Sequence, residues 1–371
     1  MSCLETNHTW TLTSLPPDHL AIKVRWAYKV KRNIDGSIER RRARLVVKGF
    51  TQRPGIDFTE TCAPVLKYDS LRAILAILAI AAADDLDLFQ FDVASAYLQS
   101  PLVEELYVEH PAGFCVVGRE RDVYRLHKCL YGLRQASRAG NDTFNTFLSA
   151  FGLVASEADP CVYLYQSGTD FLIVALWVDD GLLICNNSEL LAKILSYLKT
   201  KFVITPKTAD QFVGLHITRD RVNRKLYLSQ PSYIASLLCT FGMMDCNPVT
   251  TPVDSNNRLV ASSSSCNEVF PYSEAVGNLL YLMLSTRSDI SFAVGQVAQF
   301  ARQPGRPHWN AVKRIFSYLK GTATFGICFG GVNDGLLKAF SDADFAGDLY
   351  TRRSTTGYIL LLNGGPVARG S

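Results

Sequence analysis

The stretch FLIVALWVDDGLLIC (171–185) decides how this chain folds. Apolar residues on both sides of an acidic pair predict two adjacent strands, Phe171–Val178 and Leu182–Cys185, joined by a tight turn. Asp180 followed by a glycine suits that turn. Asp179 and Asp180 are costly to bury without a partner, so they are either solvated at a hairpin tip or neutralised by a divalent cation. This stretch alone leaves both alternatives open.

A third carboxylate lies in the strand predicted over Leu88–Val93. The alternation of this strand turns Asp92 away from its apolar side chains. If the strand lies beside the hairpin described above, Asp92 and Asp179 converge at one end of a sheet. Carboxylates that share two metal ions support in-line phosphoryl transfer. Alternatively, Asp92 is an ordinary aspartate that stabilises a turn or caps a helix.

Positive charge is concentrated near the amino terminus. The 371 residues include 38 Lys and Arg against 34 Asp and Glu, a net charge of +4. Ten of these basic residues but only two acids lie between Lys23 and Lys48, so this segment carries +8, and the other 28 basic and 32 acidic residues carry −4. Alternating side chains on both sides of the turn Asn33–Gly36 predict a basic β-hairpin over 21–50. Cations also protect exposed sheet edges, but this excess favours a phosphate-facing surface.

The remaining patterns indicate a folded α+β chain. Apolar residues make up 48% and charged residues 19%, which excludes a disordered chain. The longest apolar run, 73–83, is too short to cross a bilayer, and the amino terminus shows no signal-peptide pattern. Ten cysteines without CxxC spacing predict neither a zinc site nor a disulfide framework. Helices are predicted over 71–83, 141–153, 190–202, 232–241, 272–285, 288–302 and 307–320, further strands over 162–165, 224–229, 336–340 and 358–362, and no element in the closing GGPVARGS (364–371).

Seven segments, in this order along the chain, together resemble the reverse transcriptase of copia-type LTR retrotransposons. They are RWAYKVKRNIDGSIERRRARLVVKGFTQRPGIDFTETCAPV (25–65), FDVASAYLQSPLVEELYVEHPAGF (91–114), LHKCLYGLRQASRA (126–139), WVDDGLLIC (177–185), LSQPSYI (228–234), YSEAVGNLLYLMLSTRSDI (272–290) and AFSDADFAGD (339–348). The resemblance covers essentially the whole chain.

The resemblance implies a right-hand polymerase of fingers, palm and thumb over residues 1–252, with an antiparallel palm sheet. A serine-rich linker (253–267) would then lead to a helical connection (268–330). Residues 331–371 would form the incomplete start of a ribonuclease H-like α/β domain. Asp342 resembles the first catalytic carboxylate of that domain, whose later acids are missing, so no ribonuclease H activity is expected.

The resemblance also implies roles for residues of the polymerase site. Asp92, Asp179 and Asp180 would be the catalytic triad and would bind two Mg²⁺ ions, or Mn²⁺ in their place. Tyr97 would crowd the sugar 2′ carbon and reject ribonucleotides. The other implied contacts are Lys29, Lys31, Arg44 and Gln135 to the incoming nucleotide, Arg134 and Arg138 to the template, and Phe212 and Gly214 to the primer.

Three positions depart from the family pattern. Trp177 stands where Tyr is usual, Gly140 where Trp is usual, and Ser137 where Pro is usual. The leading hypothesis is an RNA-directed DNA polymerase that uses dNTPs and an RNA or DNA template-primer, without a membrane partner, in cytoplasmic particles. The departures motivate an alternative, a catalytically inactive, degenerate nucleic-acid-binding remnant. A different Mg²⁺ phosphotransferase is a third hypothesis that leaves the Tyr97 and Gln135 motifs unexplained.

Overall fold

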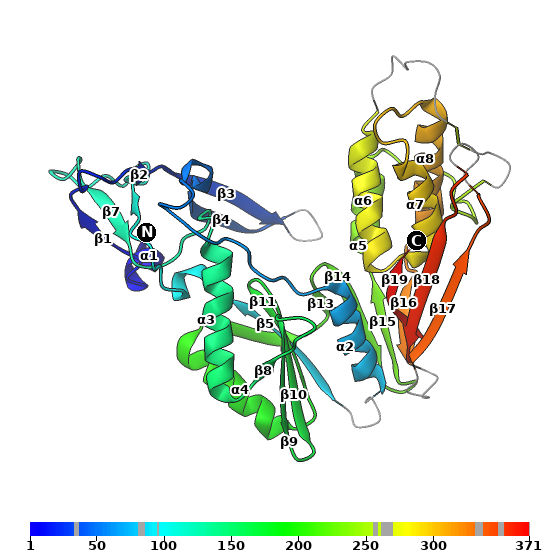
Figure 1. Cartoon of the computed structure of the whole chain (residues 1–371), viewed down its shortest axis with the longest axis horizontal. Coiled ribbons are helices and arrows are strands. Elements are labelled where there is room, and N and C mark those ends of the chain that lie inside the picture. The colour runs from blue at the N-terminus through cyan, green and yellow to red at the C-terminus, as the bar shows by residue number, and fades with distance from the viewer. Residues whose placement is uncertain are drawn as a thin grey trace. The chain divides into compact units, whose positions relative to one another are not determined.

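The chain forms two compact units in the computed structural model (Figure 1). Residues 1–66 and 89–207 make the first unit, and residues 67–88 and 208–371 make the second. The structure describes residues 1–32, 37–80, 86–94, 96–254, 259–260, 270–330, 337–347 and 352–370, without the side chains of 31, 32, 39, 77–80 and 87. Within these ranges, no helix is both long and apolar enough to span a membrane.

A six-stranded sheet forms the centre of the first unit. Its order is β12-β5-β11-β10-β9-β8, and β10 pairs antiparallel with both β9 and β11. Helices α3 and α4 bury their apolar faces against this sheet, with Phe144 and Leu198 in the shared core. The bounds are β5 Asp87–Val93, β8 Val154–Ala155, β9 Val162–Ser167, β10 Asp170–Trp177, β11 Asp180–Cys185, β12 Ile204–Thr208, α3 Ala136–Phe151 and α4 Ser188–Lys201.

The predicted basic hairpin is confirmed as the antiparallel pair β3 and β4. Its turn, Asn33–Gly36, lies outside the described residues. A four-stranded sheet, β1-β7-β6-β2, shares a core with the base of this hairpin through Leu45 and Val47. The bounds are α1 Ser2–Thr6, β1 Trp10–Thr13, β2 Ala21–Ile22, β3 Val24–Arg32, β4 Ile38–Val47, η1 Gly49–Thr51, η3 Ala96–Gln99, β6 Tyr107–Val108 and β7 Val123–Leu126.

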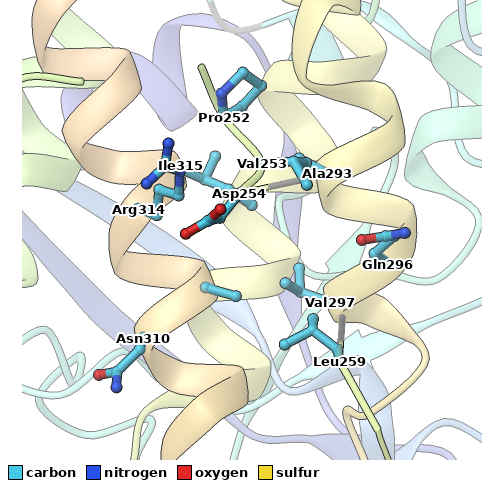
Figure 2. A pocket seen from close by; sticks show the side chains of 11 residues that line it. Pro252, Val253, Asp254, Leu259, Ala293, Gln296, Val297, Asn310, Arg314 and Ile315 are labelled. Carbon is cyan, nitrogen blue, oxygen red and sulfur yellow. The ribbon is translucent and has the colours of Figure 1, made fainter. Parts of the chain in front are cut away.

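Helices α5, α6, α7 and α8 pack around one apolar core in the second unit. A sheet of order β13-β14-β15-β16 belongs to the same unit. A cavity of about 200 Å³ lies between α7, α8 and the 252–254 segment. Figure 2 shows its lining, in which the polar side chains Asp254, Gln296, Asn310 and Arg314 join apolar residues. The bounds are β13 Gln211–Phe212, β14 Leu215–Asp220, β15 Lys225–Ser229, α5 Pro231–Thr240, α6 Tyr272–Ser285, η4 Ser288–Ile290, α7 Ser291–Ala298, α8 Arg306–Gly321 and β16 Gly326–Gly330.

The prediction that the chain ends without a further element is wrong. Strands β17 (Leu337–Ala343), β18 (Thr356–Leu362) and β19 (Gly365–Gly370) form a three-stranded antiparallel sheet. The buried guanidinium of Arg72, in α2 (Tyr68–Ile80), donates to the β19 carbonyl of Val367 at 2.9 Å. Glycines near both ends of segment 364–371 favour a loop in the sequence, yet this segment forms β19, which pairs with β18 and packs on α2.

Candidate active site

The central hairpin turns two residues earlier than the sequence indicates. Trp177 pairs with Asp180, so Val178 and Asp179 form the two-residue turn and Asp180 begins β11. The predicted turn at Asp180-Gly181 is therefore wrong. A Cβ atom on Gly181 would collide with the Phe91 ring, so this glycine serves close packing and not a turn.

This turn is strained. Val178 has a φ of +55°, a conformation that β-branched residues rarely adopt because Cβ crowds the backbone. Such a residue costs about 1–3 kcal/mol and persists only where its surroundings impose it. The strain is located beside Asp179, which points to a functional reason for the geometry of this turn.

Asp92 and Asp179 come together as the adjacent-strand hypothesis requires. Strands β5 and β11 are neighbours, and the Val93 amide donates to the Asp179 carbonyl at 2.9 Å. Burial raises the pKa of Asp179, and the nearby Asp92 carboxylate raises it further, while Arg44 opposes both. Within the described residues, Asp179 Oδ1 is buried and accepts no hydrogen bond. A partly buried carboxylate with an oxygen that accepts no hydrogen bond, beside a second carboxylate, is an arrangement that a cation would stabilise.

Asp180 lies in a different environment from Asp179. Its Oδ1 atom accepts a hydrogen bond from Gln90 Nε2 at 3.4 Å. Among the residues that the structure describes, no three His, Cys, Asp or Glu side chains are arranged as a ready-made metal site. Mg²⁺, however, is usually held by one or two carboxylates with phosphate oxygens completing its shell. Asp92 and Asp179 therefore fit a magnesium ion that binds together with a phosphate substrate.

Two tyrosines and an arginine surround this acidic pair. The Arg44 guanidinium carbon lies 4.7 Å from the centre of the Tyr131 ring, a cation–π contact. The Tyr97 and Tyr131 rings meet edge to face, with centroids 4.8 Å apart. Burial raises the pKa of both phenols, and the charge of Asp179 adds to the effect. Tyr131 had no predicted role, although its place beside Gly132 in the 126–139 segment was an available signal.

The base of the basic hairpin is attached to the chain around Tyr131. The Val47 amide donates to the Tyr131 carbonyl at 2.8 Å. Gly132 has a φ of +93°, and a Cβ atom there would collide with the Val47 carbonyl and lie 2.7 Å from Val46 Cγ1. Only glycine permits this approach, and the approach places Arg44 of β4 over Tyr131.

Gln135 is buried in a hydrogen-bond network. Gln52 Nε2 donates to Gln135 Oε1 at 3.1 Å, and Gln135 Nε2 donates to the Asp57 carbonyl at 3.1 Å. The neighbouring Arg134 donates from Nε to the Gly49 carbonyl at 3.0 Å. These bonds fix the loop that follows the hairpin. Contact of Gln135 with a nucleotide stays a prediction, and it would require these bonds to be exchanged.

Two other predicted contact residues, Arg138 and Lys29, lie beside groups other than the acidic pair. Arg138 pairs with Glu60 at 2.7 Å and lies near Asp142 at 3.8 Å. Lys29 is exposed on β3 opposite Arg42, whereas the Lys31 side chain lies outside the described part of the chain.

Three further predicted residues belong to the second unit. Phe212 is buried, and Gly214, with a φ of +76°, lies in the turn between β13 and β14. Asp342 is exposed on β17, where its Oδ1 accepts a hydrogen bond from the Ala343 amide at 2.8 Å.

The family model described as "Reverse transcriptase (RNA-dependent DNA polymerase)" matches residues 7–255, and the chain belongs to this family. It is 42% identical to the "Retrovirus-related Pol polyprotein from transposon TNT 1-94" of Nicotiana tabacum over 99% of this chain and 28% of that protein. It is 38% identical to the corresponding polyprotein from transposon RE2 of Arabidopsis thaliana, over 98% of this chain and 25% of that protein. The predicted resemblance to copia-type retrotransposon reverse transcriptases is thereby confirmed.

The chain spans about a quarter of the length of these curated relatives. A solved structure titled "Structure of the foamy viral protease-reverse transcriptase dRH in complex with ds DNA" is 10% identical, with a TM-score of 0.49, over 99% of this chain and 53% of that chain.

Proposed function

We propose that this chain is an RNA-directed DNA polymerase that extends a primer with dNTPs on an RNA or DNA template. The observation that carries the proposal is the pair Asp92 and Asp179, held together by adjacent strands with Arg44 and Tyr97 beside them. Family membership supports the reaction class.

Asp92 and Asp179 would hold two Mg²⁺ ions, or Mn²⁺, together with the triphosphate, and Asp180 would complete the catalytic triad. Ions held by these carboxylates would supply Lewis-acid chemistry: a lower pKa for the primer hydroxyl and neutralisation of charge on the pyrophosphate. Arg44 would bind phosphate oxygens through its planar guanidinium, which Tyr131 holds in place.

The sugar of the incoming nucleotide would lie against Tyr97. This side chain is fixed by the Tyr131 ring and by a 3.2 Å hydrogen bond to Ser137 Oγ. A ring held from two sides resists displacement by a 2′-hydroxyl, so it would disfavour ribonucleotides by steric conflict.

The proposed architecture is a right hand. The six-stranded sheet would be the palm and the basic hairpin part of the fingers, with thumb and primer contacts (Phe212, Gly214) in the second unit. The functional boundaries at 252, 267 and 330 stay predictions. So do the ribonuclease H-like identity of 331–371, the vestigial role of Asp342 and location in cytoplasmic particles.

Primer extension on an RNA template with Mg²⁺ tests the proposal. Asp92→Asn and Asp179→Asn should each abolish incorporation, because amides bind magnesium weakly. Asp18→Asn makes the same change at an exposed carboxylate of the first unit and should leave incorporation unchanged. Equal extension by the wild-type protein and Asp179→Asn would overturn the proposal.

A nucleic-acid-binding remnant without catalysis is the second candidate. A cavity beside Tyr97, at a glycine in the interior of α3, favours it because the cavity leaves one side of this ring loosely packed. The remnant would bind labelled primer–template with salt-dependent affinity yet incorporate no nucleotide. Incorporation that depends on Asp179 excludes this candidate.

A further inference from the structure

A cavity of about 250 Å³ lies behind Tyr97 in the first unit. Its inner wall is apolar: Ala96, Phe144, Cys161 and Leu176 line it, and each is less than 5% exposed. Polar side chains lie among the remaining lining residues, which are Thr61, Ala63, Pro64, Val65, Tyr97, Ser137, Gly140, Asn141 and Val178.

Gly140 explains why this space exists. It is a buried residue near the start of the sixteen-residue helix α3, where glycine costs about 1 kcal/mol relative to alanine. Its backbone does not adopt a positive φ. A Cβ atom there would lie 3.6 Å from the Tyr97 ring and 4.0 Å from Ser100 Oγ, an ordinary contact distance. Neither strain nor close approach requires glycine, so a side chain is missing at a place that could hold one.

The size and chemistry of the cavity define what it can bind. An engineered apolar cavity of about 150 Å³ stays dry and binds benzene, so a larger one accommodates a fused ring system. The Tyr97 and Phe144 rings and the Cys161 sulfur line the cavity, and each can contact an aromatic ligand favourably. Ser137 and Asn141 offer oxygen acceptors to a single N–H group. These features match indole, which has two fused rings and one donor.

We propose that this cavity is a binding site for a small fused-ring heteroaromatic molecule of the indole type, and that its occupant restricts Tyr97. The ring already packs against Tyr131 on one side and bonds to Ser137 through its hydroxyl. A ligand in front of Gly140 would pack against the remaining side of the Tyr97 ring. The expected effect on sugar selection rests on the proposed function, in which Tyr97 selects the sugar. Binding of the molecule to the cavity does not rest on that function.

Calorimetric titration of the full chain with indole tests binding. The wild-type protein and Gly140→Ala should give saturable binding, since a methyl group leaves most of the cavity free. Gly140→Trp should give none, because its own indole ring fills the site, and should unfold at a higher temperature. Absence of binding to the wild-type protein, or undiminished binding to Gly140→Trp, overturns the proposal.

A second measurement needs no variant. Cys161 is buried in the cavity wall, and Cys115 is exposed in the same unit. At an indole concentration of ten times Kd, alkylation of Cys161 should slow by about tenfold, since protection follows 1 + [L]/Kd. Alkylation of Cys115 should not change. Equal rates at Cys161 with and without indole, measured by peptide mass spectrometry, contradict occupancy.

The effect on Tyr97 is measured by the ratio of ribonucleotide to deoxyribonucleotide incorporation. Indole should lower this ratio by about threefold in the wild-type protein, a small change in relative barrier heights. It should have no effect on Gly140→Trp, whose ratio is already low. Binding with an unchanged ratio overturns the effect on Tyr97. Absence of all incorporation refutes both the proposed function and the effect on Tyr97. The proposed binding site is then tested by calorimetry alone.

Discussion

Tyr131 connects the predicted phosphate-binding and sugar-selecting side chains. Its ring contacts both Arg44 and Tyr97, whereas its hydroxyl is buried and makes no hydrogen bond within the described residues. Tyr131→Leu should therefore raise the KM for dNTPs by about tenfold, because Arg44 loses a contact of about 1 kcal/mol or more. Ribonucleotide incorporation should rise as well.

Tyr131→Phe is the matched control for this change. It keeps the ring and removes only an unsatisfied hydroxyl, so KM and stability should change little. Steady-state kinetics with saturating primer–template separate the two variants. A KM for Tyr131→Leu equal to that of the wild-type protein would remove Tyr131 from the site.

Gly181 permits the close contact between β11 and Phe91 of the neighbouring strand. Gly181→Ala should lower the free energy of unfolding by about 1–3 kcal/mol through overpacking. Gly277→Ala, in a helix with open space around the added methyl, should be neutral or stabilising. Urea unfolding of both variants provides the comparison, and equal stability of Gly181→Ala and the wild-type protein would contradict the packing account.

At the scale of the element, the β3–β4 hairpin carries most of the concentrated positive charge. Arg41 and Arg42 lie on β4, paired with Val30 and Lys29. If this surface meets phosphate, replacing both arginines with Gln should reduce the slope of log affinity against log salt by about 2, since each phosphate contact contributes about 0.9.

The control pair lies on α4 of the same unit. Lys193→Gln with Lys199→Gln removes the same charge from a different surface and should leave the salt slope unchanged. Fluorescence anisotropy of labelled primer–template between low and moderate salt measures both slopes. Equal slopes in the two double variants would show that the hairpin contacts no more phosphates than α4 does.

Local patterns predicted most elements because apolar periodicity follows the core. The helix expected over 272–285 matches α6, and the strand over 171–178 matches β10 within a residue. The predicted hairpin turn is wrong because Asp180-Gly181 has turn chemistry, whereas Gly181 lies within β11 and packs closely against Phe91, a residue distant in sequence. Tyr131 was missed for the same reason, since its role arises from contacts with two other segments. Such contacts leave no periodic signal.

At the scale of the whole molecule, the second unit contains an ion pair between a buried arginine and a partly exposed aspartate. Arg287, fully buried, binds Asp289 at 2.7 Å, and the Tyr318 hydroxyl donates to the same carboxylate at 2.8 Å. Although burial alone would raise the pKa of Asp289, the hydrogen bonds and charge of Arg287 hold it below its usual value.

The free energy of unfolding of this unit should therefore decrease at acidic pH. A carboxyl group with a lowered pKa stabilises the fold above its unfolded pKa, about 3.9, and this stabilisation is lost as pH falls through the folded pKa. Asp289→Asn should be less stable at pH 7, by about 1–3 kcal/mol, because the buried Arg287 loses its charged partner while its bonds to Thr322 remain. Its stability should also fall less steeply below pH 4. Urea unfolding at several pH values measures both effects, and parallel pH profiles would refute the assignment.

The second unit is built from two separate parts of the chain, residues 67–88 and 208–371. Helix α2 leaves the ribosome more than a hundred residues before β15, β16 and β19, on which it packs. Its apolar side chains, including Leu71, Ile74 and Leu75, thus remain without their final partners while the entire remainder of the first unit is synthesised. The order of translation leaves these side chains uncovered in the growing chain, and the two units cannot be expressed separately by a single division of the gene.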